Sequence, residues 1–302
     1  MIKNILMVAV AVILIGSFTA PICMNFNEDD DLYVVVLAGQ SNAAYRFADV
    51  SLVNTDVSAP AEGCYYYGTP ESPVLYESYS ESTDYKIYSM YENGWKIGNI
   101  EPTLAKNIGN ITGHDVLVIN CGVSGASISQ LVPGTTYNTW TTEVITDALA
   151  EIDRPYEKLG FVWVQGEADT SMAQETYIDY FDDMLDYYDG LGFKESFIIQ
   201  TKGINSRYAQ QEIVRTHDNV YMATDVTAGF SIYNGMINVD DTVHYTQAAD
   251  NIIGNLTGEF IGEHFRTLED VYQDLIKLIP LLLIVAVLVG VVGSFILKKD
   301  SD

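Results

Sequence analysis

One stretch, residues 33–42 with the sequence YVVVLAGQSN, constrains the fold of this chain more than any other. Residues 34–38 are apolar without alternation, which is typical of a strand buried on both faces of a parallel sheet. The apolar run stops at Gly39, and three polar residues follow. Such a strand would place the Ser41 hydroxyl at the carboxyl edge of the sheet, where open α/β folds bind their ligands. Taken alone, the stretch equally suits a glycine-assisted turn with a serine that caps the next helix.

From residue 101 onward, short apolar runs alternate with amphipathic stretches. We predict four further strands at 115–121, 161–164, 195–201 and 220–226, and four helices at 102–108, 140–152, 175–188 and 247–260. Strands and helices that alternate at this spacing predict right-handed crossovers and helices on both faces of the sheet. The expected fold class is therefore α/β, a three-layer α/β/α architecture around a five-stranded parallel sheet.

The segment 45–98 is rich in Tyr, Ser, Glu and Gly and shows no clean helical period. We expect irregular excursions and short hairpins above the sheet edge. A segment of this length without regular structure is usually functional or mobile, and a decorated surface loop is the plainer alternative.

The overall charge excludes one class of partner. The 302 residues carry 41 acidic and 15 basic side chains, a formal net charge of −26, so the phosphates of nucleic acids would be repelled. Three cysteines are too few for a disulfide scaffold, and no C-x-x-C pair offers a zinc site. Cys64 and Cys121 could pair in an oxidising compartment, although we expect buried free thiols. No metal or organic cofactor is expected.

Both ends of the chain have the composition of export or membrane segments. Residues 1–22 combine Lys3, an apolar run and a small-residue exit, the order of a secretory signal peptide, with an uncleaved anchor as the alternative. Residues 278–297 contain no charge and would extend about 30 Å as a helix, which matches the hydrocarbon core of a bilayer. Two lysines begin the tail 298–302 and predict that it stays in the cytoplasm. We therefore expect the body, 31–267, to lie at the cell surface, anchored to the membrane.

Polar and small residues follow three of the predicted strands and precede the last helix. They are Ser41 after the first strand, Gly122 and Gly125 after the second, Gln165 after the third, and the segment 240–246 before the helix. Glycines let the backbone approach a ligand closely and turn an amide N–H toward it. Because the carboxyl ends of parallel strands meet at one edge, we expect these groups to share a site.

Asp241 and His244 stand three residues apart, so that on one turn the carboxylate can hold the imidazole N–H. This contact would fix the tautomer in which the other ring nitrogen accepts a proton. The other three histidines have no comparable neighbour. A cap at the entry of the last helix is the structural alternative for the pair.

Four blocks, in this order along the chain, resemble the SGNH (GDSL-like) hydrolases. They are 39–42 (GQSN), 120–127, 165–169 (QGEAD) and Asp241-x-x-His244. The combination of GQSN with QGEAD is more narrowly similar to the sialate O-acetylesterase-like carbohydrate esterases. The resemblance covers roughly residues 32–260 and implies the flavodoxin-like fold of that family.

The resemblance also implies roles for individual residues. Ser41 would be the nucleophile, His244 the general base and then acid, and Asp241 the group that orients the imidazole. The N–H groups of Ser41 and Gly125 and the side-chain amide of Gln165 would form the oxyanion hole. The chemistry agrees, because a serine hydroxyl is a poor nucleophile until a base takes its proton. The developing oxyanion, in turn, needs donors that are already aimed at it.

Four further residues are candidates for substrate binding: Gln40, Asn42, Arg46 and Glu167. Internal hydrogen bonding is the alternative for Glu167, and a surface ion pair is the alternative for Arg46. The chain departs from the family at 43–45, where AAY replaces Met-Ala-Gly, and at 124–126, where SGA replaces Gly-Gly-Thr. These departures leave the preference for acyl group and sugar open.

Together these features predict an exported, membrane-anchored serine esterase that removes O-acetyl groups from carbohydrate through an acyl-enzyme. Its expected partners are an acetylated carbohydrate substrate and the membrane, but not nucleic acid. Two alternatives stay open. One is a catalytically degenerate glycan-binding adhesin on the same fold, and the other is an esterase that acts on short-chain lipid or other acyl esters.

Overall fold

The computed structural model of the chain describes residues 32–44, 61–81, 83–92 and 98–267. Within these ranges, eight strands form one sheet: β1 (Leu32–Gly39), β2 (Cys64–Thr69), β3 (Ser72–Pro73), β4 (Lys86–Ser89), β5 (Val116–Gly122), β6 (Tyr156–Val164), β7 (Ser196–Ile199) and β8 (Val220–Thr224). Their order in the sheet is β3-β2-β5-β1-β6-β7-β8, and β4 pairs with β2.

The five predicted strands are present as the adjacent, parallel strands β5, β1, β6, β7 and β8. Numbered along the chain, their order is 2-1-3-4-5, the flavodoxin-like order. After β1 the chain forms β2 to β5 on one side of β1 and then crosses to β6 on the other side, so β1 and β6 flank the switch point of the topology. Gly39 lies opposite both Gly122 and Val164, which places the ends of these three strands level with one another.

The predicted strand count was wrong, because the sheet continues beyond β5. β2 runs parallel to β5, and β3 and β4 pair with β2 in the antiparallel sense. These strands come from the Tyr-rich segment that was expected to form irregular excursions and short hairpins, and the antiparallel pairs of β2 with β3 and β4 agree with the expected hairpins. Tyrosine favours strands, but strands of two to six residues at the edge of a sheet depend on pairing with a distant strand, which no local pattern reveals.

Six α-helices accompany the sheet in the described part of the chain: α2 (Ser41–Ala44), α3 (Glu101–Thr112), α4 (Thr136–Ala150), α5 (Gln174–Gly190), α6 (Ile204–Thr216) and α7 (Gln247–Phe265). Short 3-10 turns lie at η2 (Tyr76–Ser78), η3 (Ile128–Gln130), η4 (Val226–Gly229) and η5 (Ile232–Asn234). The four predicted helices correspond to α3, α4, α5 and α7, whereas α6 was not predicted.

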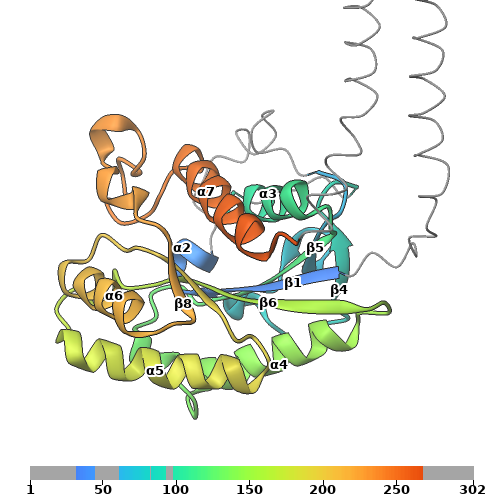
Figure 1. Cartoon of the computed structure of the whole chain (residues 1–302), viewed down its shortest axis with the longest axis horizontal. Coiled ribbons are helices and arrows are strands. Elements are labelled where there is room, and N and C mark those ends of the chain that lie inside the picture. Colours follow the sequence, from blue (N-terminus) through green and yellow to red (C-terminus); the bar gives the residue numbers. More distant parts are fainter. Residues whose placement is uncertain (1–31, 45–60, 82, 93–97, 268–302) are drawn as a thin grey trace, which may run out of the picture. The chain divides into compact units, whose positions relative to one another are not determined.

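The helices cover both faces of the sheet, which confirms the three-layer architecture (Figure 1). Val34 and Val36 of β1 point into the core formed with α4, α5 and α6, and Val35 and Leu37 point into the core formed with α3 and α7. Every residue of β1 is buried. The unbroken apolar run of β1 is explained by these two cores.

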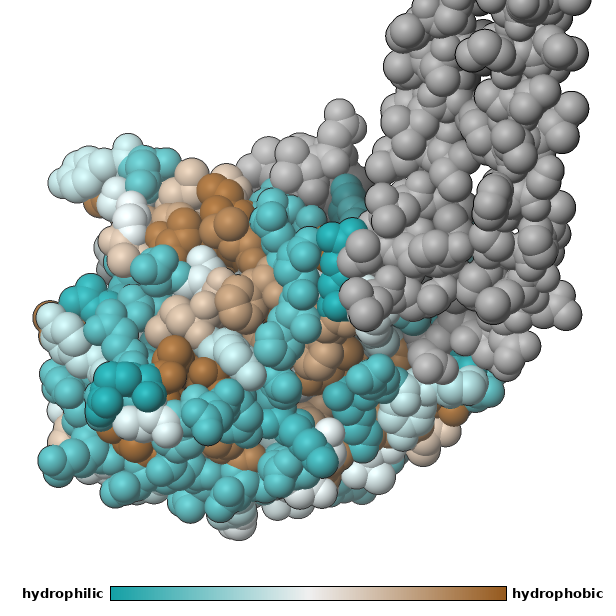
Figure 2. All heavy atoms as spheres, in the orientation of Figure 1, coloured by the Kyte–Doolittle hydropathy of each residue, from teal (hydrophilic) through white to brown (hydrophobic). Residues whose placement is uncertain are grey.

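Helices α3 and α7 lie very close together. A Cβ at Gly254 of α7 would overlap Thr103 Oγ1 and the Ile100 carbonyl oxygen, so only glycine permits this approach. On the other side of the sheet, α5 carries six carboxylates, and the surface along the lower edge of Figure 2 is largely hydrophilic. The apolar residues in that view gather instead over the region of α7 (Figure 2).

The predicted fold class included a C-terminal transmembrane helix at 278–297, and this part of the prediction is corrected. Among the described residues, no helix is both long and apolar enough to cross a membrane. The segment 278–297 itself, the tail 298–302 and the leader-like residues 1–22 lie outside the described ranges. The predicted membrane partner is withdrawn with the helix.

Candidate active site

The nucleophile candidate Ser41 stands at the end of β1, directly after a sharp turn. Gly39 has a φ of +137°, and a Cβ there would overlap the Val164 carbonyl oxygen of β6. Glycine therefore lets β1 end close against β6, where Gln40 N–H donates to Val164 O at 2.9 Å. Ser41 is the first residue of α2 and is only 5% exposed. The turn places the Ser41 hydroxyl at the carboxyl edge of the sheet, as expected from the sequence.

The Gln40 side chain connects this turn to the segment that follows β6. This side chain is buried, and its Oε1 accepts from the N–H groups of Gly166 at 3.3 Å and Ala168 at 3.1 Å. The side chain that was predicted to bind substrate therefore serves an internal contact in this structure.

Asp241 and His244 form the predicted pair. Asp241 Oδ2 accepts from His244 Nδ1, and Asp241 Oδ1 accepts from Val243 N–H at 3.1 Å. The hydrogen bond from His244 lowers the pKa of Asp241, so the carboxylate stays ionised. An ionised acceptor places the imidazole proton on Nδ1, which leaves Nε2 as the nitrogen that can accept a proton.

The side chain of Asn42 brings the His244 segment beside the nucleophile. Asn42 Nδ2 donates to Val243 O at 3.4 Å, and Tyr245 N–H donates to Asn42 Oδ1 at 3.4 Å. The two neighbours of His244 thus both contact the residue that follows Ser41. We call these two contacts the Asn42 clamp.

Ser41 Oγ has no hydrogen-bond partner within the described ranges, and catalytic hydrogen bonds often tighten only when substrate is bound.

The Glu167 carboxylate accepts hydrogen bonds from two residues of the Asn42 clamp, Asn42 and Tyr245. Its Oε1 accepts from Asn42 Nδ2 at 2.9 Å and from Tyr245 OH at 3.3 Å. Burial of the carboxyl group raises the pKa of Glu167. Both Asn42 and Glu167 were predicted to bind substrate, and the structure uses their polar atoms to hold the histidine segment instead.

The loop after β5 presents Gly125, the second predicted oxyanion donor. Asp169 anchors this loop, because its carboxylate accepts from Ser127 Oγ at 2.6 Å and from Ile128 N–H at 2.8 Å. Neither the Ser41 N–H nor the Gly125 N–H has an acceptor among the described residues. Both backbone donors are therefore available to a developing oxyanion.

Gln165, the third predicted donor, is arranged differently. It is completely buried, and its Nε2 donates to Ala126 O at 3.2 Å and to Asp169 Oδ2. Its Oε1 accepts from Tyr177 OH at 2.9 Å. Both amide hydrogens are used, so Gln165 braces the Gly125 loop in this structure and could reach an oxyanion only by giving up these bonds.

Two buried residues close to the Ser41 backbone were not among the predicted site residues. Glu101 and Asn120 are buried and hydrogen-bonded to each other, with Glu101 Oε1 accepting from Asn120 Nδ2 at 2.6 Å. Polar groups in apolar surroundings are costly unless paired, so an Asn inside the apolar run 115–121 was the signal that could have pointed to them. Arg46 lies outside the described residues.

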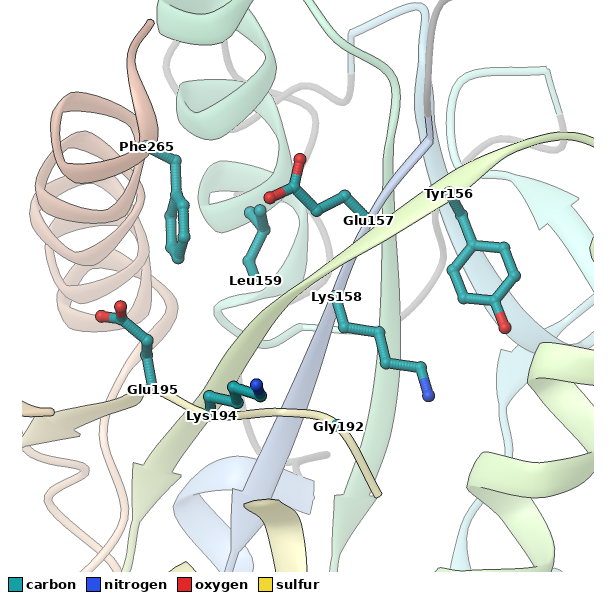
Figure 3. Close-up of a pocket in the computed structure, with 8 residues that line it drawn as sticks. All are labelled: Tyr156, Glu157, Lys158, Leu159, Gly192, Lys194, Glu195 and Phe265. Carbon is teal, nitrogen blue, oxygen red and sulfur yellow. The ribbon is translucent and has the colours of Figure 1, made fainter. Parts of the chain in front are cut away.

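One hollow of the surface, of about 590 Å³, opens at the amino edge of the sheet and contains none of the predicted site residues (Figure 3). Its lining consists of Tyr156, Glu157, Lys158, Leu159, Gly192, Lys194, Glu195 and Phe265.

Cys64 and Cys121 are buried free thiols. Within the described ranges, no cluster of His, Cys, Asp or Glu could hold a metal ion.

Comparisons with known proteins identify a matching family and a shared fold. Residues 31–261 match the model of a family described as carbohydrate esterase, sialic acid-specific acetylesterase. A structure of a protein from Arabidopsis thaliana aligns with a TM-score of 0.54 and 16% identity over 77% of this chain and 98% of that one. A carbohydrate acetylesterase from Xanthomonas citri aligns with a TM-score of 0.53 and 15% identity over 76% of this chain and 56% of that one. At such identities the two structures show a shared fold alone. A comparison with curated protein sequences gives no match.

Proposed function

We propose that this chain, which belongs to the carbohydrate esterase, sialic acid-specific acetylesterase family, removes O-acetyl groups from a carbohydrate with Ser41 as nucleophile. Membership of that family makes the chain a carboxylic ester hydrolase of the SGNH type. His244 acts as the base and Asp241 orients it. The reaction passes through an acetyl-enzyme and uses the backbone N–H groups of Ser41 and Gly125 as oxyanion donors.

The first half of the reaction transfers the acetyl group to the enzyme. His244 Nε2 takes the Ser41 proton while Ser41 Oγ attacks the acetyl carbonyl carbon. The tetrahedral oxyanion is held by the N–H groups of Ser41 and Gly125. When the intermediate collapses, the bond to the sugar oxygen breaks, and that oxygen leaves with the proton from His244.

The second half returns the enzyme to its starting state. A water molecule gives a proton to His244 and attacks the acetyl carbon of acetyl-Ser41. Collapse of the second tetrahedral intermediate releases acetate and reprotonates Ser41 Oγ from His244. Asp241 stays ionised throughout and stabilises the imidazolium that forms in each half.

One observation carries the proposal. The Asn42 clamp joins the residue after Ser41 to the residues on both sides of His244, although about two hundred positions separate these segments in the sequence. A pure binding protein has no need to fasten a serine beside an imidazole whose tautomer is fixed by a carboxylate.

The test compares wild type with Ser41→Ala on p-nitrophenyl acetate and on acetylated sugars, with acetate release as the readout. We expect a loss of roughly a thousandfold or more for Ser41→Ala. Ser78→Ala, which changes an exposed serine on η2, serves as the matched control and should keep wild-type activity. Equal turnover by wild type and Ser41→Ala would remove Ser41 from the mechanism.

The same assay separates the alternatives. Binding to a glycan without release of acetate would favour an adhesin, and faster turnover of longer acyl esters would favour a lipid or acyl esterase. We also propose, from residues 1–22 alone, that the enzyme is exported; recovery of the protein only inside the cell after fractionation would refute this.

A further inference from the structure

The carboxyl group of Glu101 lies in a buried hydrogen-bonded chain that the mechanism above does not use. Glu101 is the first residue of α3 and is 0% exposed. Its Oε1 accepts from Asn99 Nδ2 at 2.7 Å and from Asn120 Nδ2 at 2.6 Å. Its own N–H donates to Asn99 Oδ1 at 3.1 Å. One carboxylate oxygen therefore holds two amide side chains that lead in different directions.

Asn120 connects this carboxyl to the nucleophile segment and to the loop after β5. Asn120 Nδ2 also donates to Ala43 O at 3.0 Å, two residues after Ser41. Asn120 Oδ1 accepts from Gly122 N–H at 2.9 Å, at the end of the strand that leads to Gly125. A single side chain thus fixes the backbone of both segments that present the oxyanion donors.

Asn99 connects the carboxyl to the histidine segment. Gln247 is the first residue of α7, three residues after His244, and its Nε2 donates to Asn99 O at 3.1 Å. Gln247 and Asn99 are both buried. The close approach of α7 to α3 at Gly254 holds this junction in place.

We propose that Glu101 is a positioning residue that fixes the Ser41 segment relative to the His244 segment, through Asn120 on one side and through Asn99 and Gln247 on the other. The carboxyl group does not reach the substrate; it acts through the backbone of the two segments. The inference rests on the proposed function, because it requires Ser41 and His244 to act together.

We call the hydrogen-bonded chain of Gln247, Asn99, Glu101 and Asn120 the Glu101 bridge. The Asn42 clamp and the Glu101 bridge both join the Ser41 segment to the His244 segment, but at different positions. The clamp contacts the residues on both sides of His244, whereas the bridge contacts the start of α7 and the end of α2. Two independent ties resist both separation and rotation of the segments. A displacement of about 1 Å in a catalytic group can cost roughly a hundredfold in rate.

The state of the carboxyl group guides the choice of variants. Burial raises the pKa of Glu101 to about 7, although its hydrogen bonds to Asn120 and Asn99 oppose the shift. Glu101 Oε2 is buried and accepts no hydrogen bond within the described ranges. Glutamine is therefore a close substitute, since it keeps the accepting oxygen and is neutral.

The experiment measures kcat and KM for p-nitrophenyl acetate in wild type, Glu101→Gln and Glu101→Leu. We expect Glu101→Gln to stay within about threefold of wild type, because the acceptor is retained. Glu101→Leu removes the acceptor and should lower kcat roughly a hundredfold while KM changes little. Thr257→Val, which alters another buried polar residue of α7, is the matched control and should keep wild-type kcat.

The outcomes separate this inference from the proposed function. If wild type releases no acetate, the proposed function fails and the positioning role falls with it. If wild type is active and a folded Glu101→Leu keeps its kcat, only the positioning role is overturned. Should Glu101→Leu fail to fold, Gln247→Met breaks the bridge at its other end, and an unchanged kcat in that variant likewise overturns the inference, whereas a loss of about tenfold supports it.

Discussion

The two edges of the central sheet differ in how they treat polar groups. At the carboxyl edge, Gln40, Gln165 and Asp169 are buried, and their polar atoms are bound to one another or to strand exits. At the amino edge lies a hollow of about 590 Å³, where Glu157 and Lys194 are exposed (Figure 3). Burial of a polar group is costly unless a partner is placed to offset it, whereas exposed charges around a hollow are ordinary. The network, and not the volume of the hollow, locates the site.

Matched histidine variants at the two edges test this difference most strongly. His244→Gln at the carboxyl edge should lower kcat roughly a thousandfold, because no base remains to take the Ser41 proton. His264→Gln at the amino edge breaks the 2.8 Å contact with Glu195 and should leave kcat unchanged. Steady-state hydrolysis of p-nitrophenyl acetate measures both. Equal effects of the two substitutions would erase the distinction between the edges.

The Asn42 clamp predicts a smaller loss. Asn42→Ala removes both contacts to the histidine segment and leaves the Glu167 carboxylate with one fewer donor. We expect kcat to fall roughly 10- to 100-fold, with KM for a small ester little changed. Glu157→Gln at the amino edge is the control. A rise in KM with kcat intact would instead return Asn42 to the role of a substrate-binding residue.

The pH dependence of activity follows from the state of His244. Protonated imidazole cannot accept the Ser41 proton, whereas Asp241, whose pKa is lowered, stays ionised in mild acid. Activity should therefore fall as the pH is lowered. Rates measured from pH 5 to pH 8 on an ester that is stable over this range would reveal the slope. A flat profile would exclude His244 as the base.

The smallest predicted effect concerns stability. Burial raises the pKa of Asp250, in the first turn of α7, to about 8. The folded protein therefore holds a proton that the unfolded chain releases near the ordinary aspartate pKa of 3.8, and the stability due to this carboxyl is lost as pH rises from about 4 to 8. Asp250→Asn should be more stable than wild type at pH 8 by roughly 2 kcal/mol, with the gap closing toward pH 4. Urea unfolding at the two pH values measures the gap, and a constant difference would contradict the assignment.

The elements that could be predicted are those that carry their own pattern. The unbroken apolar run of β1 and the 3.6-residue stripe of α5 depend on local sequence, and both are present. Helix α6 escaped prediction because few of its apolar residues are buried, chiefly Ala209 and Ile213, and polar Ser206 and Gln210 share the same face.

The candidate residues could be named from the sequence, but not every orientation of their side chains. Ser41, Asp241 and His244 were singled out from strand ends and spacing, and their catalytic roles were implied by the family resemblance. The direction of the Gln165 amide was not predictable, because it is set by Ala126 and Asp169 from other elements. The Asn120–Glu101 contact likewise joins β5 to α3, and no local pattern encodes such a pairing.

The central claim is that Ser41 carries the acetyl group during turnover. An acid quench of the enzyme mixed with excess p-nitrophenyl acetate, followed by proteolysis and mass spectrometry, tests it directly. We expect a single acetylated peptide, the one that contains Ser41, which is absent from Ser41→Ala. Acetate release without any label on Ser41, or with the label on another residue, would exclude Ser41 as the nucleophile.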